Sequence, residues 1–196
     1  GGLGYIGTEL CKLYSGLSWH HNISVIDNRF ISERVNQIRN WNINFIQGDI
    51  LDKEMIKKYC SDADIIHHLA GVTDVPRTKS EDSNEKNKKI KEVGETGTQN
   101  ILDVIDNKCK IIFPSTHVVF EGIGDVKKDI AENEKTKPVL SYSTSKAINE
   151  EQLKKSGKNY VILRLGSVYG YSTDSMRIDI MPNLFSKISS QNGTLK

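Results

Sequence analysis

Five short apolar segments are separated along the chain by segments with helical spacing, and this alternation constrains the fold more than any other feature. The apolar segments are residues 22–28, 43–50, 63–71, 109–116 and 159–166. They do not alternate between apolar and polar residues, which is typical of strands buried on both faces of a parallel sheet. Helical patterns are found at about residues 8–17, 53–60, 81–107 and 143–156. We therefore predict an α/β fold with a doubly wound parallel sheet covered on both faces.

The charges of the chain are nearly balanced, with 27 basic and 25 acidic residues and a formal net charge of +2. Nucleic-acid binders usually carry a basic patch or stripe, so no nucleic-acid partner is expected. No segment approaches the roughly 20 apolar residues of a transmembrane helix, so no membrane partner is expected either.

The three cysteines, Cys11, Cys60 and Cys109, lie far apart in the sequence and lack C-x-x-C spacing. Free buried thiols and a cytoplasmic location are therefore expected. No second histidine or carboxylate lies at metal-ligand spacing from His117, so no metal site is predicted.

The glycine-rich sequence GGLGYIG occupies residues 1–7, directly before the first helical segment. Its glycines fit two spacings, G-x-G-x-x-G at Gly2, Gly4 and Gly7, and G-x-x-G-x-x-G at Gly1, Gly4 and Gly7. In either spacing the glycines let the backbone turn tightly and approach a pyrophosphate, and the following helix offers its N-terminal amides to the negative charge. A phosphate-bearing cofactor is therefore expected at this turn.

Asp27 ends the next predicted strand, 20 residues after Gly7. A carboxylate at this place accepts hydrogen bonds from the ribose hydroxyls of adenosine, so the glycine turn and Asp27 together predict a dinucleotide site. The same carboxylate would repel a 2′-phosphate, which favours NAD over NADP. Arg29, two residues later, keeps NADP open as the alternative.

Tyr142 and Lys146 lie four residues apart in YSTSK, at the start of a predicted helix. Residues at this spacing share one helix face, and a nearby cation lowers the pKa of a tyrosine from about 10 toward the range of a general base. Ser115 and Thr116 end a predicted strand upstream of them. Ligands of open α/β sheets bind outside that carboxyl edge, so a reaction site is expected there.

Seven motifs in this order resemble the extended short-chain dehydrogenase/reductase family, specifically its NAD-dependent nucleotide-sugar epimerases and dehydratases. They are GGLGYIG, VIDN, GDI, HHLAG, PSTHVVFEG, YSTSK and LRLGSVYG. The resemblance covers nearly the whole chain and implies a Rossmann-type fold, bound NAD and a nucleotide-sugar substrate.

The resemblance also implies roles for individual residues. Thr116, Tyr142 and Lys146 match the catalytic residues of the family. The residues implied to bind NAD are Gly1, Gly4, Tyr5, Ile6, Gly7, Asp27, Asn28, Asp49, Ile50, Leu69, Ala70, Gly71, Tyr142 and Lys146. By this comparison the glycines hold the pyrophosphate, Asp49 and Ile50 touch the adenine, and the turn at residues 69–71 lines the cofactor.

The sequence departs from the family pattern at several positions. Gly71 stands where alanine is commoner, Gly94 where the family often has asparagine, and Ser167 where many epimerases carry a substrate-binding asparagine. The 4,6-dehydratases usually follow the catalytic threonine with Asp and Glu, whereas His117 and Val118 follow it here, so dehydration is disfavoured. The sequence STHVVFEG also resembles the deoxysugar reductases of the same superfamily.

The favoured function implied by the resemblance is therefore an NAD-dependent nucleotide-sugar epimerase, which oxidises a sugar carbon to a ketone and reduces it again on the other face. An NAD(P)H-dependent reductase or dehydratase is the alternative within enzymes, and an NAD-sensing binding protein is the alternative outside them. The resemblance also implies that the full-length protein is a homodimer, paired through the helices at about residues 81–107 and 143–156.

The domain organisation expected from the resemblance is an NAD-binding domain over residues 1–170 and the start of a substrate-binding part over residues 171–196. Both are expected to be incomplete, since a first strand would precede Gly1 and most of the substrate-binding part would follow Lys196. That first strand normally lies centrally in the sheet, and its loss leaves backbone groups of its neighbours unpaired. The 196 residues alone are therefore expected to be poorly stable and inactive.

Overall fold

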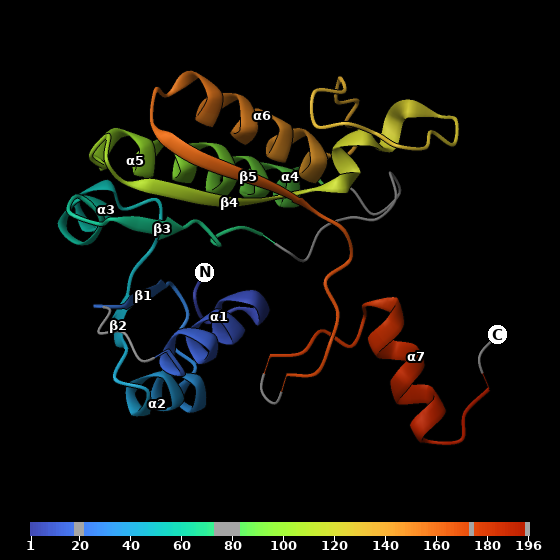
Figure 1. Ribbon diagram of the computed structural model, residues 1–196, viewed down its shortest axis with the longest axis horizontal. Coiled ribbons are helices and arrows are strands. Elements are labelled where there is room, and N and C mark those ends of the chain that lie inside the picture. The colour runs from blue at the N-terminus through green and yellow to red at the C-terminus, as the bar shows by residue number, and fades with distance from the viewer. Residues whose placement is uncertain (18–21, 73–82, 173–174, 195–196) are drawn as a thin grey trace. The chain divides into compact units, whose positions relative to one another are not determined.

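The computed structural model describes residues 1–17, 22–72, 83–172 and 175–194 (Figure 1). These residues form two compact units. The first unit contains Gly1–Gly48 and Gly166–Lys196, and the second contains Asp49–Leu165.

The first unit is built on a pair of parallel strands, β1 (Ser24–Asp27) and β2 (Asn44–Gln47). Its helices are α1 (Tyr5–Ser15), α2 (Ser32–Asn40) and α7 (Met181–Ser190). The core of this unit consists of buried apolar side chains from the glycine-rich turn, α1, β1, α2 and the residue before β2, namely Leu3, Cys11, Val25, Val35, Ile38 and Ile43. Because α2 and β1 both pack on this core, they hold the glycine-rich turn against the end of β1.

The second unit contains three parallel strands in the order β3 (Ile65–His67), β4 (Lys110–Thr116) and β5 (Asn159–Leu165). Its helices are α3 (Lys53–Cys60), α4 (Asn84–Lys91), α5 (Gly97–Val104) and α6 (Ser141–Lys155). A π-helix, η2 (Glu92–Thr96), joins α4 to α5, and a 3₁₀ helix, η3 (His117–Ile123), follows β4 directly. Capping side chains fix two of these helix starts, since Asp52 accepts from the Met55 amide and Ser83 from the Lys86 amide.

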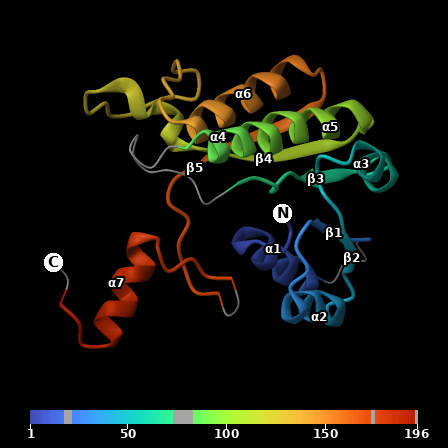
Figure 2. The same ribbon diagram turned by 180° about the vertical axis from the view of Figure 1, so that it is seen from behind.

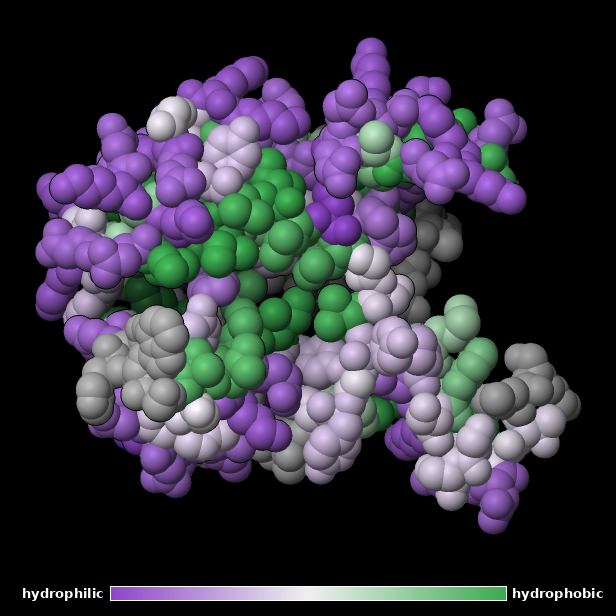
Figure 3. Space-filling view, viewed as in Figure 1, coloured by the Kyte–Doolittle hydropathy of each residue, from purple (hydrophilic) through white to green (hydrophobic). Residues whose placement is uncertain are grey.

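Helices α4, α5 and α6 all lie over one face of the three-stranded sheet, as the view from behind shows (Figure 2). That face carries the buried side chains of Ile111, Phe113 and Ser115. The opposite face of β5 presents Val161 and Leu163, which are 39% and 43% exposed, and Figure 3 shows hydrophobic side chains gathered over this strand. Within the described part of this unit, the helices therefore cover one face of the sheet.

The prediction of an α/β fold with parallel strands is confirmed, and all five predicted strands form. They make two sheets rather than one. The edge of β1 that faces away from β2 is occupied by the glycine-rich turn, because Gly2 N donates to Ile26 O at 3.3 Å. The π-helix interrupts the helix predicted at about residues 81–107, of which residues 81 and 82 lie outside the described ranges. Helix α2 was not predicted.

All three cysteines are free and buried, as the sequence predicted. None of the helices in the described ranges has the length and apolar character needed to cross a bilayer.

Candidate active site

The glycine-rich turn packs so tightly that two of its glycines have no room for a side chain. A Cβ on Gly2 would lie 2.4 Å from Val25 Cγ1, and a Cβ on Gly7 would lie 2.4 Å from Gly2 O. Helix α1 begins directly after Gly4, which supplies no side-chain cap, and its first turn contains no acidic residue. The N-terminal amides of α1, which include those of Tyr5, Ile6 and Gly7, therefore suit a phosphate in geometry and in charge.

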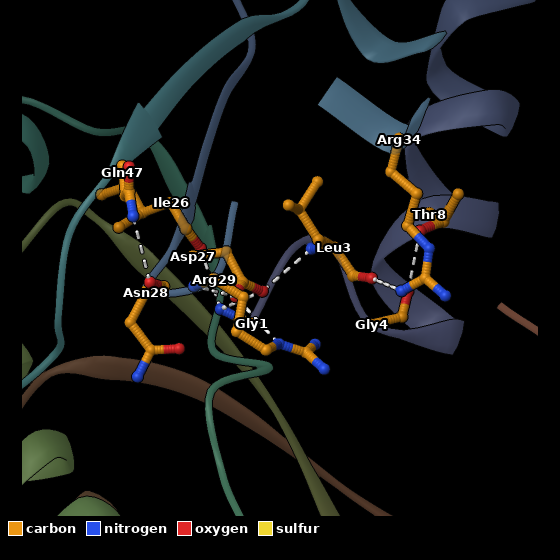
Figure 4. Close-up of polar contacts among 10 residues, drawn as sticks. All are labelled: Gly1, Leu3, Gly4, Thr8, Ile26, Asp27, Asn28, Arg29, Arg34 and Gln47. Atoms are coloured by element: carbon orange, nitrogen blue, oxygen red, sulfur yellow. Dashed lines mark hydrogen bonds and ion pairs between the residues drawn. The ribbon is translucent and has the colours of Figure 1, made fainter. Parts of the chain in front are cut away.

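Asp27 is 3% exposed and connects the end of β1 to the glycine-rich turn (Figure 4). Its Oδ2 accepts from Leu3 N at 3.1 Å, and its Oδ1 accepts from Arg29 N at 3.0 Å and from Arg29 Nε at 3.4 Å. Burial acts to raise the pKa of Asp27, but hydrogen bonds from the Arg29 and Leu3 amides and the charge of the Arg29 guanidinium hold it below its usual value. Asp27 is therefore an ionised carboxylate at neutral pH, as ribose binding requires.

Two arginines lie beside this carboxylate and the turn. Arg29 has a side chain that is 59% exposed while it contacts Asp27. Arg34, from α2, donates to Leu3 O (Figure 4). Asn28, the remaining predicted residue here, is exposed, and its carbonyl accepts from Gln47 Nε2 at 3.4 Å.

Asp49 and Ile50 follow β2 at the start of the second unit. Asp49 Oδ1 accepts from Leu51 N at 3.0 Å, and Ile50 is buried against Gly97, whose Cβ would lie 2.8 Å from Ile50 Cγ2. The side chain of Asn100 donates to Ile50 O at 3.0 Å and fixes this segment to α5. Nothing in the sequence alone pointed to Asn100, because it lies within a helix of ordinary composition.

The turn at residues 69–71 follows β3. Leu69 N donates to His67 O at 3.0 Å, and Leu69 and Ala70 are half-buried. A Cβ on Gly71 would meet no atom within 4 Å. The departure from alanine at this position therefore has no steric cause.

Thr116, Tyr142 and Lys146 all lie in the second unit, at the end of β4 and in the first turns of α6. Thr116 is 8% exposed, and its Oγ1 accepts from Val118 N at 3.3 Å, which caps the 3₁₀ helix η3. Tyr142 is the second residue of α6, and Lys146 follows one turn later on the same face. The sequence had predicted the start of this helix two residues later.

Lys146 reaches from α6 to the strand that ends in Thr116. Its Nζ donates to Pro114 O at 2.9 Å and lies 4.4 Å from the centre of the Phe113 ring and 6.0 Å from that of Tyr142. Burial lowers the pKa of Lys146 to about 8, although Glu150 acts in the opposite direction. This ammonium is therefore held between the strand and the tyrosine and loses its proton more easily than an exposed lysine.

Two histidines adjoin this group. His68 is 3% exposed, its Nε2 lies 2.9 Å from Thr98 Oγ1, and its pKa falls to about 3 because of burial and the charge on Lys146. It is neutral at pH 7 and structural, although its Nδ1 has no partner among the described residues. His117 is exposed, and its Nδ1 lies 3.1 Å from Leu165 O. No cluster of three or more metal-ligating side chains occurs in the described ranges.

Behind the three predicted catalytic residues lies an ion pair that sequence reasoning missed. Glu150, 1% exposed, accepts from Ser115 Oγ at 2.6 Å and from two nitrogens of Arg164, Nε at 3.0 Å and Nη2 at 2.7 Å. Two features of the sequence could have indicated this ion pair. Glu150 lies four residues after Lys146, on the same helix face, and Arg164 interrupts an apolar strand.

Comparison with known proteins identifies the family. The family model of the NAD dependent epimerase/dehydratase family matches residues 1–195. A candidate UDP-glucose 4-epimerase of Methanocaldococcus jannaschii is 28% identical over 182 residues, which cover 89% of this chain and 56% of that protein. The chain thus spans little more than half the length of this relative.

Two solved structures are also similar. A UDP-glucuronic acid 4-epimerase variant of Bacillus cereus, with NAD and a fluorinated substrate analogue, is 23% identical with a TM-score of 0.79, and the match covers 100% of this chain and 63% of that one. UDP-glucose 4-epimerase of Brucella ovis, in complex with NAD, is 28% identical with a TM-score of 0.67, covering 88% of this chain and 52% of that one. The family resemblance inferred from the motifs is therefore confirmed, and the chain belongs to the NAD dependent epimerase/dehydratase family.

Proposed function

We propose that the protein is an NAD-dependent nucleotide-sugar epimerase in which Thr116, Tyr142 and Lys146 act on the sugar. The observation that carries this proposal is the joint placement of the three residues, with Lys146 Nζ bonded to Pro114 O, two residues before Thr116, and 6.0 Å from the Tyr142 ring. The relatives described above act at C4 of UDP-sugars, so UDP-hexoses and UDP-hexuronic acids are the first substrates to test.

We propose that NAD is held by the residues predicted from the sequence. The glycine-rich turn fits the pyrophosphate because Gly2 and Gly7 leave no side chain in the way and the α1 amides carry no competing cap. Asp27 fits the adenosine ribose as an ionised acceptor. Asp49, Ile50 and the turn at residues 69–71 complete the adenine and cofactor contacts in this proposal.

NAD, when bound, supplies a hydride acceptor whose reduced form returns the hydride. Tyr142, as the phenolate, takes the proton from a sugar hydroxyl while the carbon that bears this hydroxyl loses hydride, so that a ketone forms. Lys146 stabilises the phenolate and holds the nicotinamide ribose, and Thr116 donates a hydrogen bond to the sugar oxygen. When the ketone is reduced on its other face, Tyr142 returns the proton. Protons and electrons therefore balance over the cycle.

We further propose that residues 1–170 form the NAD-binding domain and that residues 171–196 begin the substrate-binding part. A cytoplasmic homodimer is proposed for the protein, on the basis of its family.

A nucleotide-sugar reductase is the second candidate, favoured by the sequence STHVVFEG at residues 115–122. The two candidates differ in their use of the cofactor. An epimerase keeps NAD through purification and needs none added, whereas a reductase consumes one NADH or NADPH per product. A binding protein that only senses NAD would keep its biological role in Tyr142→Phe.

The test is to purify the protein, measure the NAD released on denaturation, and assay UDP-sugars with and without added NAD(P)H. Turnover without added cofactor that is lost in Tyr142→Phe supports the epimerase. Turnover that depends on added NAD(P)H contradicts it and favours the reductase. Absence of any turnover with intact NAD binding favours the sensing protein.

A further inference from the structure

Glu121 contacts the start of α6, the helix that carries Tyr142, from a different segment of the chain. We propose that Glu121 is a positioning residue: its carboxylate fixes the first turn of α6 to the 3₁₀ helix η3 and so sets the Tyr142 phenol relative to Thr116. This inference rests on the proposed function for the role of Tyr142, and it gives a role to a residue that the family resemblance left without one.

Helix α6 lacks a cap from its own sequence. Its N-cap is Leu140, which supplies no side-chain hydrogen bond. Glu121 Oε1 replaces that cap, since it accepts from Val139 N at 2.8 Å, from Leu140 N at 2.7 Å and from the hydroxyl of Ser143. A carboxylate at a helix N-terminus satisfies unpaired amides and interacts favourably with the helix dipole. One oxygen therefore holds the backbone on one side of Tyr142 and a side chain on the other.

The same oxygen belongs to the segment that begins at Thr116. Glu121 lies in η3 (His117–Ile123), whose first turn is capped by Thr116 Oγ1. Two backbone hydrogen bonds hold this segment to the chain before α6, Gly122 N to Lys137 O and Lys137 N to Val119 O, both at 2.8 Å. The carboxylate thus joins the segment that follows Thr116 to the segment that carries Tyr142.

The close approach of the two segments depends on Gly122. A Cβ at this position would lie 2.6 Å from Lys137 O and 2.9 Å from Val139 Cγ2. The two segments cannot move apart without breaking the hydrogen bonds between Gly122 and Lys137 and between Lys137 and Val119. The backbone of Glu121 is therefore fixed by this packing, and its carboxylate is fixed by its own hydrogen bonds.

Glu121 is an ionised acceptor. Burial acts to raise its pKa, but the hydrogen bonds from Ser143, Leu140 and Val139 hold it below its usual value. Hydrogen bonds to a charged acceptor are roughly twice as strong as those between neutral groups. A neutral amide in the same place would keep the acceptor oxygen and lose part of this strength.

The remainder of α6 has its own supports. Glu150 is bonded to Ser115 and Arg164, and Asn149 Nδ2 donates to Gly94 O at 3.1 Å. Loss of Glu121 is therefore expected to loosen the turn around Tyr142 while the helix stays folded. A displacement of about 1 Å at a reacting group lowers a rate by as much as 100-fold.

The test compares Glu121→Ala with Glu121→Gln and with a matched control, Glu151→Ala. Glu151 lies on the same helix, has a side chain that is 55% exposed and pairs only with Lys154 among the contacts described here. We expect Glu121→Ala to lower kcat at least tenfold, with KM and the Kd for NAD changed less than twofold, and Glu121→Gln to recover most of kcat. Glu151→Ala is expected to keep the kcat of the original protein.

Hydrogen exchange supplies a readout that does not depend on turnover. In Glu121→Ala, amides of residues 139–144 should exchange at least tenfold faster, whereas amides at the C-terminal end of α6 should not change. Unchanged exchange at residues 139–144 overturns the proposal, and so does faster exchange with an unchanged kcat, since Glu121 would then be only a helix cap.

The two proposals fail in distinguishable ways. If the original protein turns over no UDP-sugar, the proposed function fails, and the ultraviolet titration of Tyr142, identified by subtracting Tyr142→Phe, then decides about Glu121. A titration curve that shifts in Glu121→Ala and not in Glu151→Ala supports the positioning role. A curve that is the same in both variants refutes it.

Discussion

Removal of the Arg164 side chain is the most informative perturbation of the second unit. Arg164→Ala deletes both hydrogen bonds to Glu150, at 3.0 and 2.7 Å, the bond from Nη1 to Glu132 O at 2.9 Å, and the contact of the guanidinium with the Phe120 ring at 5.0 Å. Glu150, which is 1% exposed, keeps the Ser115 hydroxyl and a lysine 4.0 Å away. The variant therefore contains a buried carboxylate without its main partner.

The expected loss of stability follows from that buried charge. Removing one partner of a buried ion pair costs about 3–5 kcal/mol, because the other charge stays desolvated. Since the whole stability of a domain is typically about 5–15 kcal/mol, this is a large fraction of it. Arg164→Ala/Glu150→Gln should recover part of the loss, because the amide carries no charge to bury.

The pH dependence gives a second, independent check. In the original protein burial acts to raise the pKa of Glu150, but Arg164 and Ser115 hold it below its usual value. The pair therefore contributes stability above the pKa of the unfolded state, about 4.3, and this contribution is lost as the pH falls. Without Arg164, only the Ser115 hydroxyl and Lys154 still oppose the effect of burial, so the pKa of Glu150 rises. Protonation of Glu150 then relieves the destabilisation of the variant. The difference between the two proteins should shrink as the pH falls from 7 toward 4.

Urea unfolding followed by far-ultraviolet circular dichroism measures the loss, and hydrogen exchange of α6 and β5 amides assigns it to the second unit. A loss under 1 kcal/mol that does not change with pH would refute the view that this pair is a buried, coupled ion pair. Arg164→Lys, which keeps the charge but not the two-nitrogen geometry, should fall between the original protein and Arg164→Ala.

Three further predictions concern the proposed cofactor and catalytic residues. Gly7→Ala should weaken NAD binding at least tenfold by calorimetry, because its Cβ would lie 2.4 Å from Gly2 O; unchanged affinity would show that the turn can relax. Asp27→Asn should lower the NAD affinity and narrow the preference over NADP, since a neutral side chain no longer repels a 2′-phosphate; an unchanged ratio of the two Kd values contradicts this role. Burial lowers the pKa of Lys146 to about 8, so between about pH 8 and 10 the unfolded state binds more protons than the folded state. The free energy of unfolding should therefore rise with pH in this range, relative to that of Lys146→Met. If the free energies of unfolding of the two proteins change with pH in parallel, Lys146 is not a buried ammonium.

The sequence predicted the elements that depend on local pattern. The five apolar runs became parallel strands, and residues 53–60 form α3 with the predicted bounds. It missed α2 (Ser32–Asn40), because a helix with two buried residues, Val35 and Ile38, gives a weak apolar stripe among polar neighbours. The sequence also did not predict that the strands form two separate sheets, because pairing between strands is a long-range property that periodicity does not encode.

The candidate site shows the same division. Spacing alone placed Tyr142 and Lys146 on one helix face, and the structure has them there. Glu121 and Glu150 were not predicted, because their partners are 18 to 22 residues away for the first and 14 and 35 for the second. Contacts between residues this far apart in the sequence depend on how β4, β5 and α6 pack, and local sequence patterns do not predict that packing.

Isotope retention tests the central proposal most directly. A UDP-hexose deuterated at C4 is incubated with the purified protein and no added cofactor, and the products are analysed by mass spectrometry and NMR. An epimerase with enclosed NAD predicts that the epimer forms and keeps its deuterium at C4, and that Tyr142→Phe forms little or none. A product that has lost the deuterium, or that appears only when NADH or NADPH is added, would contradict the proposal.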